Sequence, residues 1–337
     1  MICIPGILHK SSWQRLRLES CDLRERGLTS GTWSNKVSHL RSFIIFTTYF
    51  GVQDFPVCLG VLLRFIPFLG RDPLAFKYAS NIISSVKWFA SLLDPSSTKV
   101  FDALLVKASL KGLKAQLSRP IRQKLPFTIE HLCLFYNYLN VNDVKQFSCW
   151  CAMILAFFGC FRLSNLVPPS KALFDPLKQL KRDDIRFEGD LALIYFKWSK
   201  TNQHSSRVAW VPIGSAVDPR FNVKRNFQLL FSLVKAPGNA PLFTFNKTQF
   251  HSRNSLVKIL DLCLYGAGLS PADYSWHSFR RGAAVFAFEL GLADSAVQLL
   301  GDWSSAAFKN YLEFAFVRKV KIAKLMAEKF DKQLVQL

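Results

Sequence analysis

The chain has 337 residues, of which 50% are hydrophobic, and its 44 Lys and Arg against 23 Asp and Glu give a formal net charge of +21. This length supports two domains of ordinary size and the apolar content supports packed cores, so a disordered chain is excluded. The basic residues are spread along the whole sequence, which favours a long basic surface facing a polyanion. We therefore expect a nucleic acid partner in preference to a membrane surface.

The longest nearly uninterrupted apolar run predicts a buried helix and no membrane span. It reads FSCWCAMILAFFGCF from Phe147 to Phe161, which is shorter than the roughly 18 residues that a spanning helix needs. The first residues, MICIPGILHKSSWQRLRL, lack the pattern of a secretory signal, so we expect an intracellular protein. Eight cysteines form no CxxC pair, and we expect reduced core thiols, no metal site and no disulfide.

The first half of the chain predicts a helical domain. After an N-terminal extension, residues 1–27, residues 28–116 carry apolar side chains at helical spacing, and several segments end at glycine or proline. Lys36 and Arg41 fall on the exposed side of the first helix. Three hydroxyl residues are candidate caps for that helix: Ser30, Thr32 and Ser34.

A basic stretch broken by proline follows this domain. It reads KGLKAQLSRPIRQKLPFT from Lys111 to Thr128, and we place the interdomain linker at residues 117–127. With Arg119, Arg122 and Lys124 in it, the linker is expected to lie against phosphates.

The second domain, residues 128–337, is predicted to be mainly helical with a small sheet, which makes the fold class α+β. Thr128 opens a helix, and the buried apolar helix that follows ends at Arg162. The segments LALIYFKWSK and RVAWVPI flank the polar loop TNQHSS and predict a hairpin, and PLFTFN predicts a further short strand. Later helices are expected at about 249–266, 277–290, 294–300, 305–316 and 318–335.

Two basic residues stand at the ends of these predicted elements. Arg162 follows the buried helix, where a charge that cannot deprotonate needs an anionic partner, and Asn165 one turn later is placed to orient it. A structural ion pair with an acidic residue is the ordinary alternative. Lys200 lies at the tip of the hairpin, where it can enter a DNA groove or approach a leaving group, or where it is simply solvated.

The sequence WHSFRRGAAVFAFELG places His277 and Arg280 in the first turn of a helix, three residues apart on one face. The apolar stripe lies on another face, so we expect both cations to converge outward on an anion such as phosphate, beside the N–H groups of the helix terminus. In the alternative, His277 is a surface histidine and Arg280 and Arg281 only snorkel to solvent.

The segment GDWSSAAFKNYLEF predicts a helix with Trp303 at its entrance and Tyr311 inside it. Tyr311 shares a face with Phe308, Leu312 and Ala315, so a tyrosine packed by its ring is the ordinary alternative to a chemical role.

The order Arg, Lys, HxxR, Trp and Tyr resembles the tyrosine recombinase superfamily, the phage-integrase-like enzymes related to type IB topoisomerases. The resemblance spans most of the chain: the helical first half looks like the family's core-binding domain, and the chain from about residue 125 onward looks like its catalytic domain. The wording WHSFRRGAA followed by LLGDWSSAAFKNYL is most similar to eukaryotic transposon recombinases of the Crypton and DIRS kind. The residues that match the family's catalytic positions are Arg162, Lys200, His277, Arg280, Trp303 and, as the nucleophile, Tyr311.

The spacing between these residues fits the family with two departures. Trp303 lies 23 residues after Arg280, as in the family, but Tyr311 lies only eight after Trp303, one fewer than in many bacterial members. Lys200 lies 38 residues after Arg162, which implies an insertion and makes Lys197 its substitute.

The resemblance implies a site-specific recombinase that cuts and rejoins DNA through a 3′-phosphotyrosyl intermediate, without metal or nucleotide, in the integration or excision of a transposon. Arg162 and Arg280 then bind the phosphate, and His277 helps to take the proton of Tyr311. Lys200 protonates the leaving 5′ oxygen, and Trp303 donates its indole N–H and positions the tyrosine helix.

The resemblance also implies double-stranded DNA held in a clamp, a dimer on each site, a tetramer in synapsis and a nuclear location. We expect the C-terminal helix, with apolar residues from Val320 to Phe330 at helical spacing, to dock on a neighbouring protomer. The residues that we expect to contact DNA are Lys36, Arg41, Arg119, Arg122, Lys124, Lys197, Arg207 and Arg281.

Three other functions compete with this interpretation. The first is a domesticated DNA-binding protein derived from a recombinase, for which a retained nucleophile has no physical use. The second is a topoisomerase that relaxes DNA as a monomer, and the third is a helical scaffold whose charge serves solubility. Binding to DNA that weakens steeply with salt excludes the scaffold.

Overall fold

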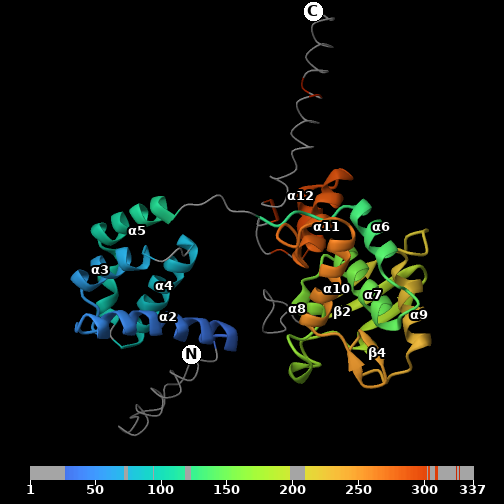
Figure 1. Ribbon diagram of the computed structural model, residues 1–337, viewed down its shortest axis with the longest axis horizontal. Coiled ribbons are helices and arrows are strands. Elements are labelled where there is room, and N and C mark those ends of the chain that lie inside the picture. The colour runs from blue at the N-terminus through green and yellow to red at the C-terminus, as the bar shows by residue number, and fades with distance from the viewer. Residues whose placement is uncertain are drawn as a thin grey trace, which may run out of the picture. The chain divides into compact units, whose positions relative to one another are not determined.

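The computed structural model describes residues 27–71, 75–93, 95–117, 123–197, 209–301, 303, 308, 309, 324 and 326. The chain divides into two compact units, Met1–Ile121 and Arg122–Leu337 (Figure 1). The division falls within the range 117–127 that the sequence predicts as a linker.

The described part of the first unit is helical, as the sequence predicts. Its helices are α2 (Ser30–Tyr49), α3 (Leu59–Leu69), α4 (Phe76–Leu93), the 3-10 helix η1 (Pro95–Asp102) and α5 (Leu104–Leu117). Helix α2 packs along α4 and α3 along α5, around a core that includes Phe43, Phe65 and Val86. The cap of α2 is Thr29, whose hydroxyl accepts from Thr32 N at 3.2 Å, so the predicted caps Ser30, Thr32 and Ser34 are wrong by one position or more.

Helix α7 (Val144–Phe158) forms the centre of the second unit, because every residue from Phe147 to Phe157 is buried. Among the helices that pack against it are α9 (Val223–Leu233), α10 (Arg253–Gly266) and α11 (His277–Glu289) (Figure 1). The sequence predicts that this helix continues to Arg162, but it ends at Phe158 because Gly159 caps it and the chain then turns.

The other short elements lie around this core. They are α6 (Ile129–Tyr138), which begins after Thr128 as predicted, α8 (Leu163–Leu166), α12 (Asp294–Leu300), and the 3-10 helices η2 (Lys171–Leu173) and η3 (Arg182–Asp184).

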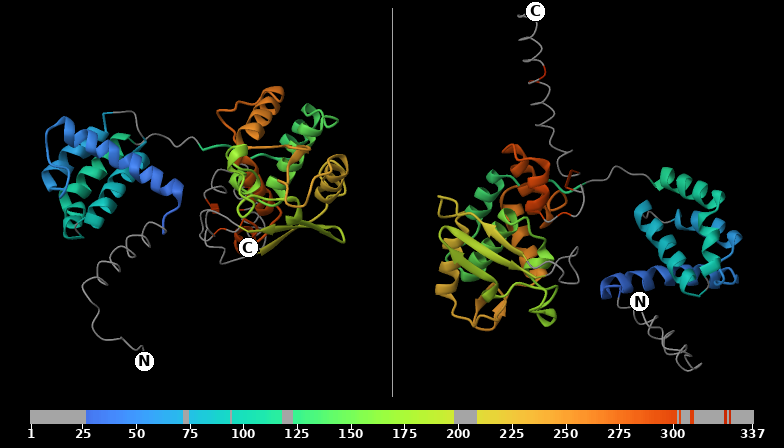
Figure 2. Two further views of the ribbon diagram at one scale, coloured as in Figure 1. Left: turned by 90° about the horizontal axis from the view of Figure 1, so that it is seen from below. Right: turned by 180° about the vertical axis from the view of Figure 1, so that it is seen from behind.

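A three-stranded antiparallel sheet lies along one face of these helices (Figure 2). Its order is β1 (Ile185–Glu188), β2 (Leu191–Phe196) and β3 (Ala209–Ile213), so the predicted hairpin is confirmed as β2 and β3. Strand β1 is too short for its pattern to predict it. A two-stranded sheet joins β4 (Thr244–Asn246) to β5 (Gln249–Phe250), and α10 therefore begins at Arg253 and not at the predicted residue 249.

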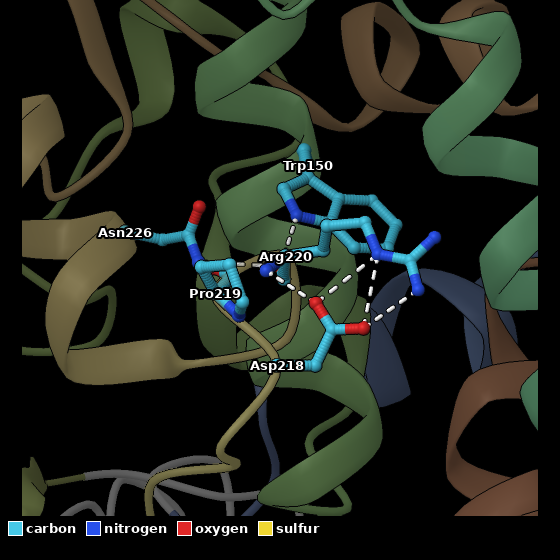
Figure 3. Close-up of polar contacts among 5 residues, drawn as sticks. All are labelled: Trp150, Asp218, Pro219, Arg220 and Asn226. Carbon is cyan, nitrogen blue, oxygen red and sulfur yellow. Dashed lines mark hydrogen bonds and ion pairs between the residues drawn. The ribbon is translucent and has the colours of Figure 1, made fainter.

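The start of α9 is fastened to α7 by a polar cluster (Figure 3). Asp218 accepts from Nε and Nη2 of Arg220, and the Arg220 carbonyl accepts from Trp150 Nε1 at 2.8 Å. Asn226 Nδ2 donates to the Pro219 carbonyl at 2.9 Å. Arg220 therefore forms a structural ion pair with Asp218. A pair of this kind is the alternative to phosphate binding that the sequence leaves open for Arg162.

Two classes of site find no support among the described residues. None of the helices in that part of the chain is both long and apolar enough to span a membrane. No three His, Cys, Asp or Glu side chains there are grouped so that they could hold a metal ion. The six described cysteines are free thiols, and four of them are buried.

His251 is a buried histidine that joins the start of α10 to α7. Its Nε2 donates to the Lys145 carbonyl at 2.9 Å and its Nδ1 lies 2.8 Å from Ser255 Oγ, an arrangement that suits a neutral ring. The residue is 1% exposed, and desolvation lowers the pKa of His251 from 6.5 to about 4.

We expect His251 to make the protein less stable as the pH falls from 6.5 toward 4. In this interval the unfolded chain binds a proton that the folded chain excludes, at a cost of up to about 1.4 kcal/mol per pH unit. Chemical unfolding at several pH values, for the unaltered chain and for His251→Gln, measures the effect. The variant should lose less stability across this interval, and an equal loss in both proteins would show that His251 does not titrate in this way.

Candidate active site

Four of the six predicted catalytic residues lie in the described part of the second unit: Arg162, His277, Arg280 and Trp303. Lys200 and Tyr311 lie outside the described residues. Arg162 precedes α8, His277 and Arg280 occupy the first turn of α11, and Trp303 follows α12. Their contacts and charges join all four into one site, although they are up to 141 positions apart (303 − 162).

Arg280 is held inside this site by two carbonyl groups and an indole ring. Its Nη1 donates to the Cys160 carbonyl, its Nη2 donates to the Gly301 carbonyl at 2.6 Å, and its Cζ lies 4.2 Å from the centre of the Trp303 ring. With an exposed fraction of 3%, the side chain does not point outward as predicted. The reason is that α11 is buried directly after His277, with Ser278 and Phe279 at 0% exposure. Carbonyl groups are neutral acceptors, so they fix the guanidinium without cancelling its charge.

Trp303 can lie over Arg280 only because residue 301 is a glycine. A Cβ at Gly301 would lie 1.9 Å from Cζ3 of the indole. The backbone of Trp303 is also fixed, because its N–H donates to the Gln298 carbonyl at 3.1 Å and its carbonyl accepts from Gln298 Nε2 at 2.8 Å. Gly301 therefore provides both an acceptor for Arg280 and the space for the ring that covers it.

Arg162 is half-buried at the start of α8. Its backbone N–H donates to Asn165 Oδ1 at 3.2 Å, so Asn165 fixes the main chain of Arg162. Within the described ranges, no Asp or Glu forms an ion pair with Arg162. Among the described residues, Arg162 therefore has no ion pair like the one between Arg220 and Asp218.

His277 is the residue on which these positive charges act. Its pKa is lowered from 6.5 to about 4, first by desolvation and then by the charges of Arg280, Arg281 and Arg162. The residue is exposed, so solvent weakens the desolvation, but the three charges act in the same direction. At neutral pH the imidazole is therefore uncharged and able to accept a proton.

The structure places Arg281 inside the domain. It is 4% exposed, and its Nη2 donates to Gln123 Oε1 at 2.8 Å. This burial argues against the predicted DNA contact of Arg281, which stays a prediction. Lys124 is half-buried nearby in the chain, where Nζ donates to the carbonyls of Pro271 and Ala272 at 3.0 and 2.9 Å. Both cations fasten the start of the second unit to the segment around α11.

Lys197 also has partners within the second unit. Its Nζ forms an ion pair with Asp184 at 2.6 Å and donates to the Pro176 carbonyl at 2.6 Å. The side chain of Asp184 is 4% exposed, so loss of this lysine would strand a buried carboxylate. These contacts argue against Lys197 as the substitute for Lys200 and as a DNA contact.

Of the remaining predicted DNA contacts, two lie on α2 in the first unit and three lie outside the described residues. Arg41 is exposed on α2, and Lys36 is half-buried with its Nζ 4.7 Å from the centre of the Trp88 ring. Desolvation lowers the pKa of Lys36. Three further predicted contacts lie outside the described residues: Arg119, Arg122 and Arg207.

Sequence reasoning missed two residues that hold Arg280, Cys160 and Gly301. Both accept from Arg280 through backbone carbonyls, which every residue has, so their residue types do not reveal this contact in the sequence. The glycines beside them, Gly159 before Cys160 and Gly301 itself, are the only local hint of unusual backbone.

Solved structures with the same fold are DNA-bound integrases. The Tn1549 transposon integrase in complex with transposon right end DNA aligns with a TM-score of 0.61 and 16% identity over 92% of this chain and 98% of that chain. A lambda integrase dimer bound to a COC′ core site aligns with a TM-score of 0.55 and 16% identity over 91% of this chain and 81% of that chain. The chain has a tyrosine-recombinase fold. No protein-family model and no curated protein matches the sequence.

A third structure of the tyrosine-recombinase fold is a lambda integrase tetramer bound to a Holliday junction. It aligns with a TM-score of 0.56 and 14% identity over 91% of this chain and 82% of that chain. The expected fold class, mainly α with a small sheet and a helical first domain, is therefore confirmed.

We expect His277 in the free protein to titrate below its ordinary pKa of 6.5, and the substitution Arg162→Gln to raise its pKa because one nearby positive charge is lost. Proton NMR titration measures both values, with His277→Gln assigning the resonance. Arg186→Gln is the control, because Arg186 is exposed and is not among the charges that act on His277. A titration at 6.5 or above, or no effect of Arg162→Gln, would contradict the geometry of the site.

Proposed function

We propose that this protein cuts and rejoins DNA strands through a covalent 3′-phosphotyrosyl intermediate, as a site-specific recombinase. The observation that carries the proposal is the convergence of Arg162, His277, Arg280 and Trp303 on one site within a tyrosine-recombinase fold. Two guanidinium groups beside an imidazole suit the binding of a phosphate, and the matched fold supports the same role.

In the proposed reaction the scissile phosphate binds between Arg162 and Arg280. Guanidinium groups match the non-bridging oxygens of a phosphate in geometry, and their attraction grows as negative charge develops at phosphorus. The first turn of α11 adds the positive end of the helix dipole. Trp303 holds the plane of Arg280, so the guanidinium is oriented before DNA arrives.

Tyr311 is the proposed nucleophile. Its oxygen forms a bond to phosphorus while the bond from phosphorus to the 5′ oxygen breaks, and the neutral His277 helps to accept the tyrosine proton. Lys200 donates a proton to the leaving 5′ oxygen. The covalent bond conserves the energy of the phosphodiester, so a 5′ hydroxyl from another strand can reverse the step without a cofactor.

The biological setting is part of the proposal. The resemblance to Crypton and DIRS recombinases supports a role in transposon integration or excision and a nuclear location. Solved structures of the same fold include a transposon integrase on transposon end DNA and lambda integrase as a dimer and a tetramer. We extend the same assembly to this chain on double-stranded DNA, with the C-terminal helix, residues 318–335, docking on a neighbouring protomer.

Covalent capture tests the proposal. The full chain is incubated with a pool of nicked duplexes of random sequence and denatured, and DNA that migrates with protein is sequenced. We expect an adduct that disappears in Tyr311→Phe, because phenylalanine has no oxygen to bond phosphorus. The matched control is Tyr265→Phe, which removes the hydroxyl of a tyrosine that is 69% exposed on α10.

The outcomes separate the candidate functions. An adduct in Tyr265→Phe but not in Tyr311→Phe supports the nucleophile. No adduct, together with DNA binding that weakens with salt, would contradict cleavage and favour the domesticated DNA-binding protein. Relaxation of supercoils without recombinant products would favour the topoisomerase.

A second prediction compares two buried arginines. Arg182 resembles Arg280 in its contacts, since its guanidinium donates to the carbonyls of Val234 and Thr244 and its Cζ lies 4.7 Å from the Phe231 ring centre. We expect Arg280→Lys to slow adduct formation at saturating DNA by about 100-fold or more, because lysine cannot fork onto a phosphate.

Arg182→Lys removes the same kind of structural contact from a different place. We expect it to lower the unfolding temperature but to leave adduct formation in the folded protein close to that of the unaltered chain. If the two substitutions slow adduct formation equally, Arg280 has only a structural role.

A further inference from the structure

Cys160 has an unusual backbone at the turn that follows α7. Its φ is +52°, and among the described residues it is the only non-glycine with a positive φ. A residue with a Cβ is strained in this region, whereas glycine is not. Such a conformation persists where the surrounding structure holds it, and it is frequent at functional sites.

The turn directs the Cys160 carbonyl away from α7 and toward α11. The N–H groups of Cys160 and Phe161 donate to the carbonyls of Phe157 and Ala156, both at 3.1 Å, and so complete the end of α7. The Cys160 carbonyl instead accepts from Arg280 Nη1. The Cys160 thiol lies 3.7 Å from the Arg280 carbonyl, so this one residue contacts Arg280 at both its main chain and its guanidinium.

The same turn is fixed to the sheet. A Cβ at Gly159 would lie 2.2 Å from the Phe161 ring, so only glycine lets that ring lie there. Phe161 in turn stacks on Phe196 at the end of β2, with ring centres 5.4 Å apart and planes at 23°. The turn therefore connects Arg280 and Arg162 to β2, the first strand of the hairpin.

We infer that Cys160 is a positioning residue for the phosphate site, whose left-handed backbone aims its carbonyl at Arg280 and sets the orientation of that guanidinium. Because Arg162 follows two positions later, one turn places both arginines on the same anion. This inference rests on the proposed function, in which Arg280 binds the scissile phosphate. The alternative is that the Cys160 side chain, at 0% exposure, only fills space.

Two substitutions of Cys160 separate these roles. Glycine suits the left-handed backbone but leaves a cavity, whereas valine fills the space, being larger than cysteine by about one methyl group, but is strongly disfavoured at positive φ. We expect Cys160→Gly to form the covalent adduct at close to the rate of the unaltered chain and Cys160→Val to form it about 100-fold more slowly, as when a donor to the reacting phosphate is lost. If the role is space filling, the order reverses.

Cys151 provides the matched control. It is also 0% exposed, and its thiol lies 3.8 Å from the Asn226 carbonyl, but it stands inside α7. There, valine should preserve the protein better than glycine, because glycine both leaves a cavity and weakens the helix. Rates are measured at saturating DNA and below the unfolding temperature of every variant, so a loss of stability alone does not change them.

The result at Cys160 decides the inference. A rate for glycine above that for valine supports it, and a rate for valine equal to or above that for glycine overturns it. If the valine variant does not fold, Cys160→Ala replaces it. Alanine keeps the strain of a Cβ, so a faster glycine variant supports positioning, and an alanine variant that is equally fast or faster overturns it.

Failure of the proposed function would be visible separately, as the absence of an adduct with the unaltered chain. Crystal structures of the glycine and valine variants then test the positioning by itself. Retention of the Arg280 contact with the carbonyl of residue 160 in the glycine variant, and its loss in the valine variant, support the inference. The same Arg280 orientation in both variants overturns it.

Discussion

The arrangement of the second unit depends on a buried positive charge whose guanidinium donates to two backbone carbonyl groups. A guanidinium that is removed from water needs partners for its N–H groups, and Arg280 finds two in the carbonyls of Cys160 and Gly301. Those carbonyls belong to the turns after α7 and α12, so three segments distant in sequence must meet around one side chain. Displacing either turn would remove an acceptor from a buried cation, which ties the fold of the unit to the geometry of its site.

Binding by carbonyl groups leaves the positive charge of Arg280 able to attract an anionic ligand. The carbonyl groups and the Trp303 ring orient Arg280 without neutralising it, and Arg162 adds a second positive charge close enough to lower the pKa of His277. A site with two guanidinium groups and a neutral imidazole suits an anion that must be bound while a proton is removed. Phosphoryl transfer to a tyrosine makes both demands, which is why the proposed function follows from the electrostatics as well as from the fold.

The sequence predicted the elements better than it predicted how they face each other. The periodicity of α11 and the glycine after α12 set the bounds of both helices, and the β-branched runs set the hairpin. The HxxR spacing places His277 and Arg280 on one face, but it does not show that Arg280 is buried while His277 stays exposed. Nor does it show that another face of α11 lies against the Phe127 backbone, which Gly282 allows because a Cβ there would lie 2.0 Å from the Phe127 carbonyl oxygen. Nor does a cysteine in a sequence indicate a positive φ, so the positioning role that we infer for Cys160 could be recognised only from the structure.

The most direct test of the central claim is a crystal structure of Tyr311→Phe bound to a nicked duplex of the sequence recovered by covalent capture, or of any duplex that it binds. The account predicts the phosphate at the nick within about 3 Å of the Arg162 and Arg280 guanidinium nitrogens, with His277 beside it. A duplex held elsewhere on the unit, or an Asp or Glu occupying the space between the two arginines, would contradict it.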